Sequence, residues 1–312
     1  MPFFSIIIPL YNKEHFVSKT LEGVLNQSFT DYEVIVVNDG STDQSVAKVE
    51  QVNDKRITIL HQQNQGVSAA RNKGIETANA KFICFLDADD VWQPNHLQSF
   101  YEAIITFPDA KMYCNRYVTL LAKNVKVKNT FIDIADDYEG YVTDFFKSSL
   151  INRMALTSAV CIKKEVYQEI GGFNPTISSG QDTDYWIRIA IIYRVVITKN
   201  TTLIYNYLAA NNSLSKTPIN QKKLSTFEQF AAEELKNDSL KKFIDAHRIF
   251  YAMHFHILGY KKEKRKWLAG VNKKHLRFKT LCLLALPSFV SRGLLKMKHL
   301  IKTYGFDVNV YR

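Results

Sequence analysis

Three aspartates stand within four residues, directly after a short apolar run. They are Asp87, Asp89 and Asp90, and the run is Phe82 to Leu86. Because the run is too short for a helix and rich in aromatic residues, it predicts a buried central strand. Neighbouring carboxylates repel one another unless a cation or hydrogen-bond donors offset the repulsion. Oxygen ligands of this kind suit Mg²⁺ or Mn²⁺, which also bind diphosphates. The alternative is an acidic loop that only caps the helix following residues 92–94.

Strands and helices alternate along the first hundred residues. Apolar runs predict strands at 4–8, 31–37, 57–61 and 81–86. Helical periodicity predicts one helix at 14–27, a second that follows the polar residues 38–43 and ends near 52, and a third at 66–78. Pro9 is expected to close the first strand because proline cannot donate to a central ladder. The alternation predicts right-handed βαβ units and a mostly parallel sheet. The loops near Tyr11, Asp39 and Asp87 should therefore gather at one edge, where ligands bind in such sheets.

The pattern becomes less regular beyond Pro94. Strands are expected at 111–121 and 158–162, a helix opens at 178–184, and the chain is mainly helical from about Leu224. A boundary is expected near 216–220. We therefore expect an α/β domain at 1–216 and a basic, mainly helical region at 217–312.

Composition limits the class of protein. The apolar content of 46% is enough for a full hydrophobic core. No apolar run approaches the roughly 18 residues of a membrane span, and the N-terminus lacks the basic region of a signal peptide. The cysteines are scattered without metal-ligand spacing, which predicts reduced core thiols in a cytoplasmic protein. They are Cys84, Cys114, Cys161 and Cys282.

Positive charge is concentrated at the C-terminal end. Residues 261–312 contain 14 Lys or Arg and 2 Asp or Glu, against a net charge of +11 for the whole chain. Basic segments interleaved with apolar residues can lie on an anionic membrane surface. The alternative is a packed helical subdomain with a solvated basic face, and both readings stay open. We expect no nucleic-acid partner, because no recognisable nucleic-acid module accompanies the charge.

The glycine-rich loops that bind phosphates are missing from the sequence. Neither GxGxxG after the first strand nor GxxxxGK[ST] occurs. A nucleotide site in this chain must therefore neutralise its diphosphate with a metal ion and with cationic side chains. The aspartate cluster can supply the metal ligands, and Arg71, on the helix opened by Gly66, can supply a cation.

Five motifs in sequence resemble the family 2 glycosyltransferases, which are inverting enzymes of GT-A fold that use nucleotide-sugar donors. The resemblance covers roughly residues 3–215 and is densest in the first hundred. The motifs are SIIIPLYN at 5–12, VIVVNDGSTD at 34–43, NQGVSAARNKG at 64–74, FLDADD at 85–90 and GQDTDYW at 180–186.

The resemblance implies donor-binding roles for the first two loops. Pro9 and Tyr11, with Asn12 beside them, match the loop that lines the nucleobase pocket. Asp39 and Ser41 match the loop that recognises the base edge. An Asx-turn or N-cap is compatible with Asp39, although Asp43 fits a cap better.

The resemblance also divides the acidic cluster. Asp87 matches the position that usually meets the ribose or the metal, and Asp89 matches the position that coordinates the metal directly. The expected ion is Mn²⁺ or Mg²⁺. For Asp90, a structural capping role is an equal alternative.

Asp182 matches the residue that resembles a catalytic base in the family. The reaction needs a carboxylate that takes a proton from an acceptor hydroxyl, and a helix start favours the ionised form. The alternative is an ordinary acid in the first turn of a helix, and Asp184 is a reserve candidate. Gln181 departs from the usual Glu, which puts in doubt whatever acceptor contact that Glu makes.

A second departure lies downstream. Many relatives carry a His before a Ser-x-Ser element, whereas residues 207–215 contain none. Either Asn211 or Asn212 substitutes as a neutral donor, or the contact is missing. His96 and His254 are expected to be surface or core residues rather than ligands.

Together these features predict metal-dependent, inverting transfer of a sugar from a nucleotide-diphosphate sugar, most readily a UDP-sugar. The expected acceptor is a glycan or lipid-linked hydroxyl in surface-polysaccharide assembly at the cytoplasmic membrane face. A nucleotidyltransferase of related fold is one alternative, although residues 180–186 argue for glycosyl transfer. A non-catalytic nucleotide-sugar-binding protein is another, because of Gln181 and the missing His.

Overall fold

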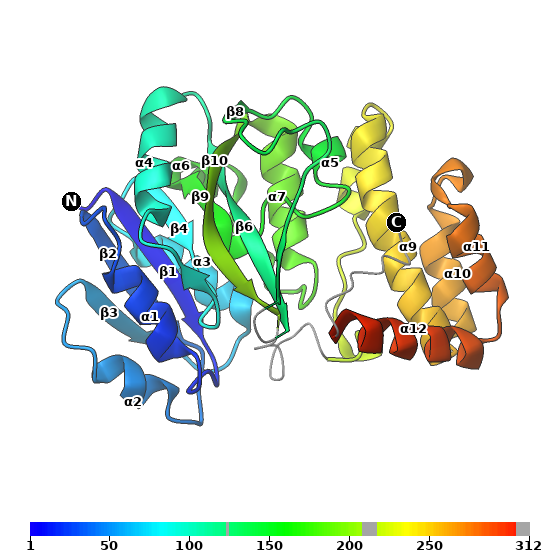
Figure 1. The fold of residues 1–312 in the computed structure, drawn as a ribbon, viewed down its shortest axis with the longest axis horizontal. Coiled ribbons are helices and arrows are strands. Elements are labelled where there is room, and N and C mark those ends of the chain that lie inside the picture. Colours follow the sequence, from blue (N-terminus) through cyan, green and yellow to red (C-terminus); the bar gives the residue numbers. More distant parts are fainter. Residues whose placement is uncertain (123–124, 208–216, 304–312) are drawn as a thin grey trace.

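A mixed β-sheet forms the centre of the protein in the computed structural model, which describes residues 1–122, 125–207 and 217–303 (Figure 1). The strands are β1 (Phe4–Leu10), β2 (Tyr32–Asn38), β3 (Ile57–His61), β4 (Phe82–Phe85), β5 (Val91–Trp92), β6 (Met112–Ala122), β7 (Val125–Lys128), β8 (Gly140–Tyr141), β9 (Val160–Lys163) and β10 (Val195–Asn206). They lie in the order β3-β2-β1-β4-β9-β6-β10-β5, with β7 beside β6 and β8 beside β10.

Helices flank the sheet and also form a group at one side of it. The helices are α1 (Val17–Leu25), α2 (Ser45–Glu50), α3 (Val67–Thr77), α4 (His96–Thr106), α5 (Phe145–Ser148), α6 (Lys164–Ile170), α7 (Gln181–Ile192), α8 (Ala231–Glu234), α9 (Asp238–Leu258), α10 (Lys261–Ala269), α11 (Phe278–Ala285) and α12 (Ser288–Thr303). Helices α9 to α12 stand together beyond α5 and α7 (Figure 1).

The first four strands form the parallel sheet that the sequence predicts. Strand β1 pairs in parallel with β2 and with β4, and β2 pairs in parallel with β3. Because these strands point the same way, the loops after β1, β2 and β4 begin at the same edge, as expected. The loops also bond to one another there, since the Asp39 N–H donates to the Leu10 carbonyl at 2.8 Å.

Pro9 does not end the first strand, so that expectation is wrong. Strand β1 continues to Leu10, and Pro9 pairs with Val37 of β2. The Ile7 carbonyl accepts a hydrogen bond from Leu86 N, so alternate residues from Ile7 onward face the β4 side. The ladder with β4 ends at Ile7. The missing N–H of Pro9 therefore costs no ladder bond.

One strand runs against the others in the middle of the sheet. Strand β9 lies antiparallel between β4 and β6, whereas β6 and β10 are parallel to each other. Cys161 of β9 consequently lies opposite both Cys84 and Tyr113. The short strands β5 and β8 also pair antiparallel with β10, and β7 pairs antiparallel with β6, so the sheet is mixed: its first four strands are parallel and antiparallel pairings begin at β9.

The C-terminal helices pack directly on the sheet domain. The Phe146 and Phe243 rings lie 5.8 Å apart between centroids, and the Ser239 hydroxyl donates to Asp144 at 2.6 Å. The same hydrophobic core cluster contains residues of α9 such as Leu240. The expected boundary at residue 216 lies outside the described residues, and the division at that point stays a prediction.

The structure confirms part of what was expected for the cysteines and for His96. Cys84, Cys114 and Cys161 are buried free thiols, but Cys282 is exposed, contrary to expectation. His96 is a core residue that bonds to Thr202, and burial lowers its pKa to about 3. Among the described residues, no helix is long and apolar enough to cross a bilayer.

Candidate active site

The loops after β1 and β2 are tied together by side chains predicted to bind the donor. Asn12 has a positive φ of 51°, and its Oδ1 accepts from Thr42 N at 2.8 Å. Its own N–H donates to the Ser41 hydroxyl at 3.2 Å. Tyr11, at the turn beyond Pro9, is 45% exposed. The structure thus brings Tyr11, Asn12 and Ser41 to one edge, with an aromatic ring open to solvent.

Asp39 is buried and connects this edge to the start of α3. Its Oδ1 accepts from the Gln62 side chain and from Gln65 N, and its Oδ2 accepts from Gly66 N, each at 2.8 Å. Gly66, at φ 89°, precedes the helix. Asp43 accepts from Ser45 N at the start of α2, as the capping interpretation predicts. Asp39 therefore positions the helix that carries Arg71.

The two predicted metal ligands each face a cation. Asp87 pairs with Arg71 at 2.5 Å and Asp89 pairs with Lys13 at 2.7 Å. Burial raises the pKa of Asp89, Lys13 opposes this shift, and the charge of Asp87 adds to it. The two carboxylates therefore lie within electrostatic reach of each other. Sequence reasoning missed Lys13, although it stands next to Asn12 in the first motif.

Asp90 differs from its two neighbours because its side chain is buried in a hydrogen-bond network. Its carboxylate accepts from the Ser158 hydroxyl at 2.6 Å and from Asn206 N at 3.0 Å. Burial and the charges of Asp89 and Asp87 raise its pKa well above the usual value. Helix α4 begins after Asn95 instead, so the capping interpretation is wrong and Asp90 joins three chain segments.

Arg71 carries unused hydrogen-bonding capacity. Its side chain is only 4% exposed, and its guanidinium lies 5.1 Å from the centroid of the Phe173 ring. One nitrogen bonds to Asp87, whereas Nε and Nη1 have no hydrogen-bond partner in the part of the chain that the structure describes. Buried donors without partners are costly, so this guanidinium is suited to an anionic ligand.

A tight contact holds Phe173 beneath Arg71. The Asn72 amide donates to the Phe173 carbonyl at 2.8 Å, and Phe173 N donates back to Asn72 Oδ1 at 2.9 Å. A Cβ on Gly172 would lie 2.2 Å from that Oδ1 and 2.5 Å from a Tyr167 ring carbon. Glycine is therefore required here by close packing.

Asp182 stands at the start of α7, next to Gly180, which has a φ of 84°. Its Oδ2 lies 3.4 Å from Arg153, and its Oδ1 accepts from Thr183 N at 2.8 Å. Burial acts to raise the pKa of Asp182, but Arg153, the Thr183 N–H and Arg71 together lower it below its ordinary value. Asp182 is thus ionised at neutral pH and lies within the field of Arg71.

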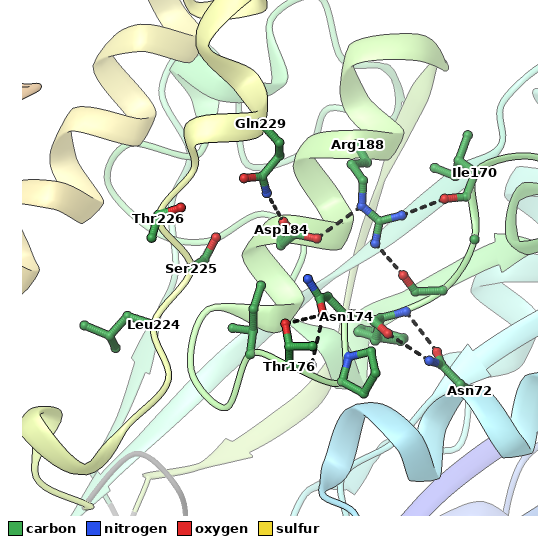
Figure 2. Close-up of a pocket in the computed structure, with 15 residues that line it drawn as sticks. Asn72, Ile170, Asn174, Thr176, Asp184, Arg188, Leu224, Ser225, Thr226 and Gln229 are labelled. Atoms are coloured by element: carbon green, nitrogen blue, oxygen red, sulfur yellow. Dashed lines mark hydrogen bonds and ion pairs between the residues drawn. The ribbon is translucent and has the colours of Figure 1, made fainter.

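Asp184, the reserve candidate, lies between Gln229 and Arg188 (Figure 2). It is bound by Arg188 at 3.1 Å and by the Gln229 amide. Arg188 also donates to the carbonyls of Ile170 and Gly172. These groups line a cavity of about 760 Å³, whose wall also includes Asn72 and Phe173. Asp184 is fully engaged in holding that wall together, which separates its role from that of Asp182.

Helix α9 contributes to the surroundings of Asp182, which sequence reasoning missed. The Tyr251 hydroxyl would be 2.7 Å from a Cβ on Gly180. Burial, and next the charge of Asp182, raise the pKa of Tyr251. Burial lowers the pKa of His247 to about 4. The charge of Arg153 also lowers this pKa, whereas the charge of Asp182 raises it. No local pattern marks Arg153 or Tyr251, because they meet Asp182 only through the tertiary fold.

The predicted residues therefore form two connected groups. The nucleobase-loop residues gather around Asn12 and Ser41, and the charged residues gather around Arg71 and Asp87, with Asp182 reached through Arg71 and Arg153. Residues 208–215, where a substitute for the missing His was expected, lie outside the described residues. Among the described residues, no cluster of three or more His, Cys, Asp or Glu side chains could hold a metal ion.

The model of "Glycosyl transferase family 2" matches residues 5–170, which is more than half of the chain. The chain belongs to this family. It is 41% identical over 99 residues to "Putative glycosyltransferase EpsH" of Bacillus subtilis, covering 31% of this chain and 29% of that protein. It is 37% identical over 112 residues to the Escherichia coli "UDP-Glc:alpha-D-GlcNAc-diphosphoundecaprenol beta-1,3-glucosyltransferase WfgD", covering 36% and 44%. These matches span less than half the length of either curated relative.

Solved structures support the same assignment at the level of the fold. A crystal structure of S. aureus TarS 1–349 in complex with UDP-GlcNAc superposes with a TM-score of 0.69 at 18% identity, covering 96% of this chain and 89% of that one. The complex with UDP gives a TM-score of 0.64 at 19% identity, covering 96% and 88%. The predicted GT-A-type α/β architecture of this family 2 member is confirmed.

Proposed function

We propose that this family 2 member transfers a sugar from a UDP-sugar to an acceptor hydroxyl with inversion, using Asp182 as the base. The observation that carries the proposal is that one buried cation serves both ends of the reaction. Arg71 pairs with Asp87 at 2.5 Å and also lowers the pKa of Asp182. The Phe173 ring beneath Arg71 also packs against Trp186 of α7, the helix whose first turn carries Asp182, so a donor diphosphate beside Arg71 would lie on the side of this carboxylate.

The donor assignment rests on the nucleobase loops and on the similar proteins. UDP-GlcNAc is bound in the TarS structure, and the name of WfgD gives UDP-Glc as its donor. We place the base against the exposed ring of Tyr11, since aromatic faces stack well on bases. Pro9, Asn12, Asp39 and Ser41 then shape the nucleoside pocket.

The donor set of Asp87 and Asp89 fits a divalent metal that binds together with substrate. Mg²⁺ and similar ions are often held by one or two carboxylates plus substrate phosphates. Two carboxylates within electrostatic reach match that pattern, and a site completed by a diphosphate needs no third protein ligand. When bound, Mn²⁺ or Mg²⁺ would stabilise the charge that grows on the departing diphosphate.

The chain's own residues supply proton transfer and positioning. Ionised Asp182 takes the proton of the acceptor hydroxyl, whose oxygen forms the new bond to the anomeric carbon. The bond from that carbon to the diphosphate breaks on the opposite side, which inverts the centre. Arg71 donates from Nε and Nη1 to the diphosphate, and Arg153 holds Asp182 in place.

The acceptor is proposed to be a lipid-linked sugar at the cytoplasmic face of a membrane, in surface-polysaccharide assembly. The support is the name of WfgD, which specifies a sugar on diphosphoundecaprenol. Gln181 is neutral where the family resemblance leads us to expect Glu, and its Oε1 lacks a hydrogen-bond partner within the described ranges. We assign Gln181 to the acceptor side.

The test compares UDP release from a panel of UDP-sugars by wild type, Asp182→Asn and Asp238→Asn. Asp238 is the matched control because it is also an acid in the first turn of a helix. Loss of a general base should lower turnover by about 10²–10⁴-fold in Asp182→Asn only. Equal loss in both variants, or none, would contradict the assignment of the base. Release of pyrophosphate would instead indicate a nucleotidyltransferase, and binding without turnover a non-catalytic protein.

A further inference from the structure

Two consecutive helices turn large apolar side chains toward solvent. In α11, Phe278 is 81% exposed and Leu281 is 46% exposed, and in α12, Phe289 is 73% and Met297 is 53% exposed. Their spacings of three and eight place each pair on one side of its helix. A surface helix normally presents its polar side to water, so these exposed faces indicate a partner.

The surroundings of these faces are strongly basic. Helix α10 has no buried residue among those described and contains five Lys or Arg against one Glu. Further exposed cations precede α11 or lie at its start. They are Lys273, Lys274, Arg277 and Lys279. The exposed apolar residues thus lie on a surface whose charged side chains are mainly positive.

Charge decides between the possible occupants of this surface. A second copy of the chain would bring two positive surfaces together, which costs energy through like-charge repulsion. An anionic bilayer satisfies both features, since lysines and arginines attract acidic headgroups while apolar rings enter the headgroup boundary. A nucleic-acid duplex, whose bases are stacked inside and whose outer surface is polar, would leave the phenylalanine rings exposed.

We propose that the outward faces of α11 and α12, with the surrounding lysines and arginines, dock the protein on anionic lipid bilayers. Phe278 and Phe289 insert, and the cations bind the lipid phosphates. Binding is peripheral and does not depend on sugar transfer.

The docking surface is joined firmly to the candidate active site. Arg292 of α12 donates to the Ile257 carbonyl of α9 at 2.9 Å, and His256 bonds to Ser291 at 3.3 Å. Helix α9 also carries Tyr251, which contacts Gly180 beside Asp182. Docking would therefore orient the site relative to the bilayer, an additional step that rests on the proposed function.

Flotation of the full chain with vesicles tests the proposal. Vesicles of phosphatidylcholine with 30% phosphatidylglycerol should carry the wild type upward, with less binding at high salt and on pure phosphatidylcholine. Phe278→Ser with Phe289→Ser should weaken partitioning by about tenfold for each ring. The control pair Ile105→Ser with Leu235→Ser removes exposed apolar groups elsewhere, at 61% and 89% exposure, and should float like wild type.

Three results would overturn the proposal. These are no flotation of the wild type, equal flotation of the Phe278/Phe289 variant, or a wild-type dimer in light scattering that this variant loses. If the double variant melts at a lower temperature, Phe278→Trp replaces it as the probe. Brominated phosphatidylglycerol should quench the added fluorescence, and no quenching would also overturn the proposal. Because the readout is flotation, failure here leaves the proposed sugar transfer standing.

Discussion

Replacing Arg71 with methionine should weaken UDP binding while the chain still folds. The buried guanidinium has two nitrogens without partners among the described residues, and the proposal assigns them to the diphosphate. A hydrogen bond to a charged group contributes about 1.5–3 kcal/mol, so losing even one weakens binding by about 10–150-fold. The cost to folding is smaller than the roughly 3–5 kcal/mol of breaking a fully buried pair, because the Asp87 side chain is 36% exposed and can be solvated.

Titration calorimetry with UDP and Mn²⁺ measures the first effect, and urea unfolding measures the second. Arg56→Met is the matched control, since Arg56 also forms an Arg–Asp pair, at 2.7 Å with Asp54, on the segment leading into β3. The control should bind UDP like wild type. Unchanged UDP affinity in Arg71→Met would refute the assignment of this guanidinium to the donor, and equal weakening in both variants would point to a general loss of folded protein.

Two further predictions follow from the packing and charge around the site. Gly172→Ala should lower the free energy of unfolding by about 2–4 kcal/mol, because its Cβ would lie 2.2 Å from Asn72 Oδ1 and break the bonds to Phe173. Gly270→Ala, whose nearest contact would be 3.6 Å, is the control in urea unfolding, and equal stability of the two variants would contradict the packing argument. The pKa of Asp182 lies below the ordinary aspartate value of 3.8, so the base stays ionised as the pH falls toward that value. Protonation of Asp182 should therefore reduce activity only in strong acid. Arg153→Gln removes a positive charge and should move the acid limb of the kcat/KM profile to higher pH, whereas an unmoved limb would exclude Arg153 from setting that pKa.

The sequence predicts the first four strands well because each is a local apolar run that ends at polar residues. Strand β9 illustrates what such patterns omit. Its residues read as a strand, but nothing local indicates that Val160–Lys163 inserts antiparallel between β4 and β6. Pro9 was misjudged for a similar reason, since its tolerance depends on where the neighbouring strand stops.

In the candidate site, too, residues marked by local sequence were predicted, whereas residues brought in by the tertiary fold were not. Asp87 was found because it follows the end of a strand, and Arg71 because it lies in a motif on the helix after Gly66, and the structure pairs them. Arg153 and Tyr251 were missed because they reach Asp182 from chain segments far away in sequence. Lys13 was missed despite its place beside Asn12, and a search for cations next to the first motif would have found it.

The most direct measurement is a crystal structure of the full chain with UDP and Mn²⁺, recorded with anomalous data. We expect the uracil to lie against Tyr11 and an anomalous peak to lie between Asp87 and Asp89. We also expect diphosphate oxygens within hydrogen-bonding distance of Arg71 and near Asp182. UDP bound elsewhere, for example in the cavity beside Asp184, or a manganese peak remote from both aspartates, would contradict it.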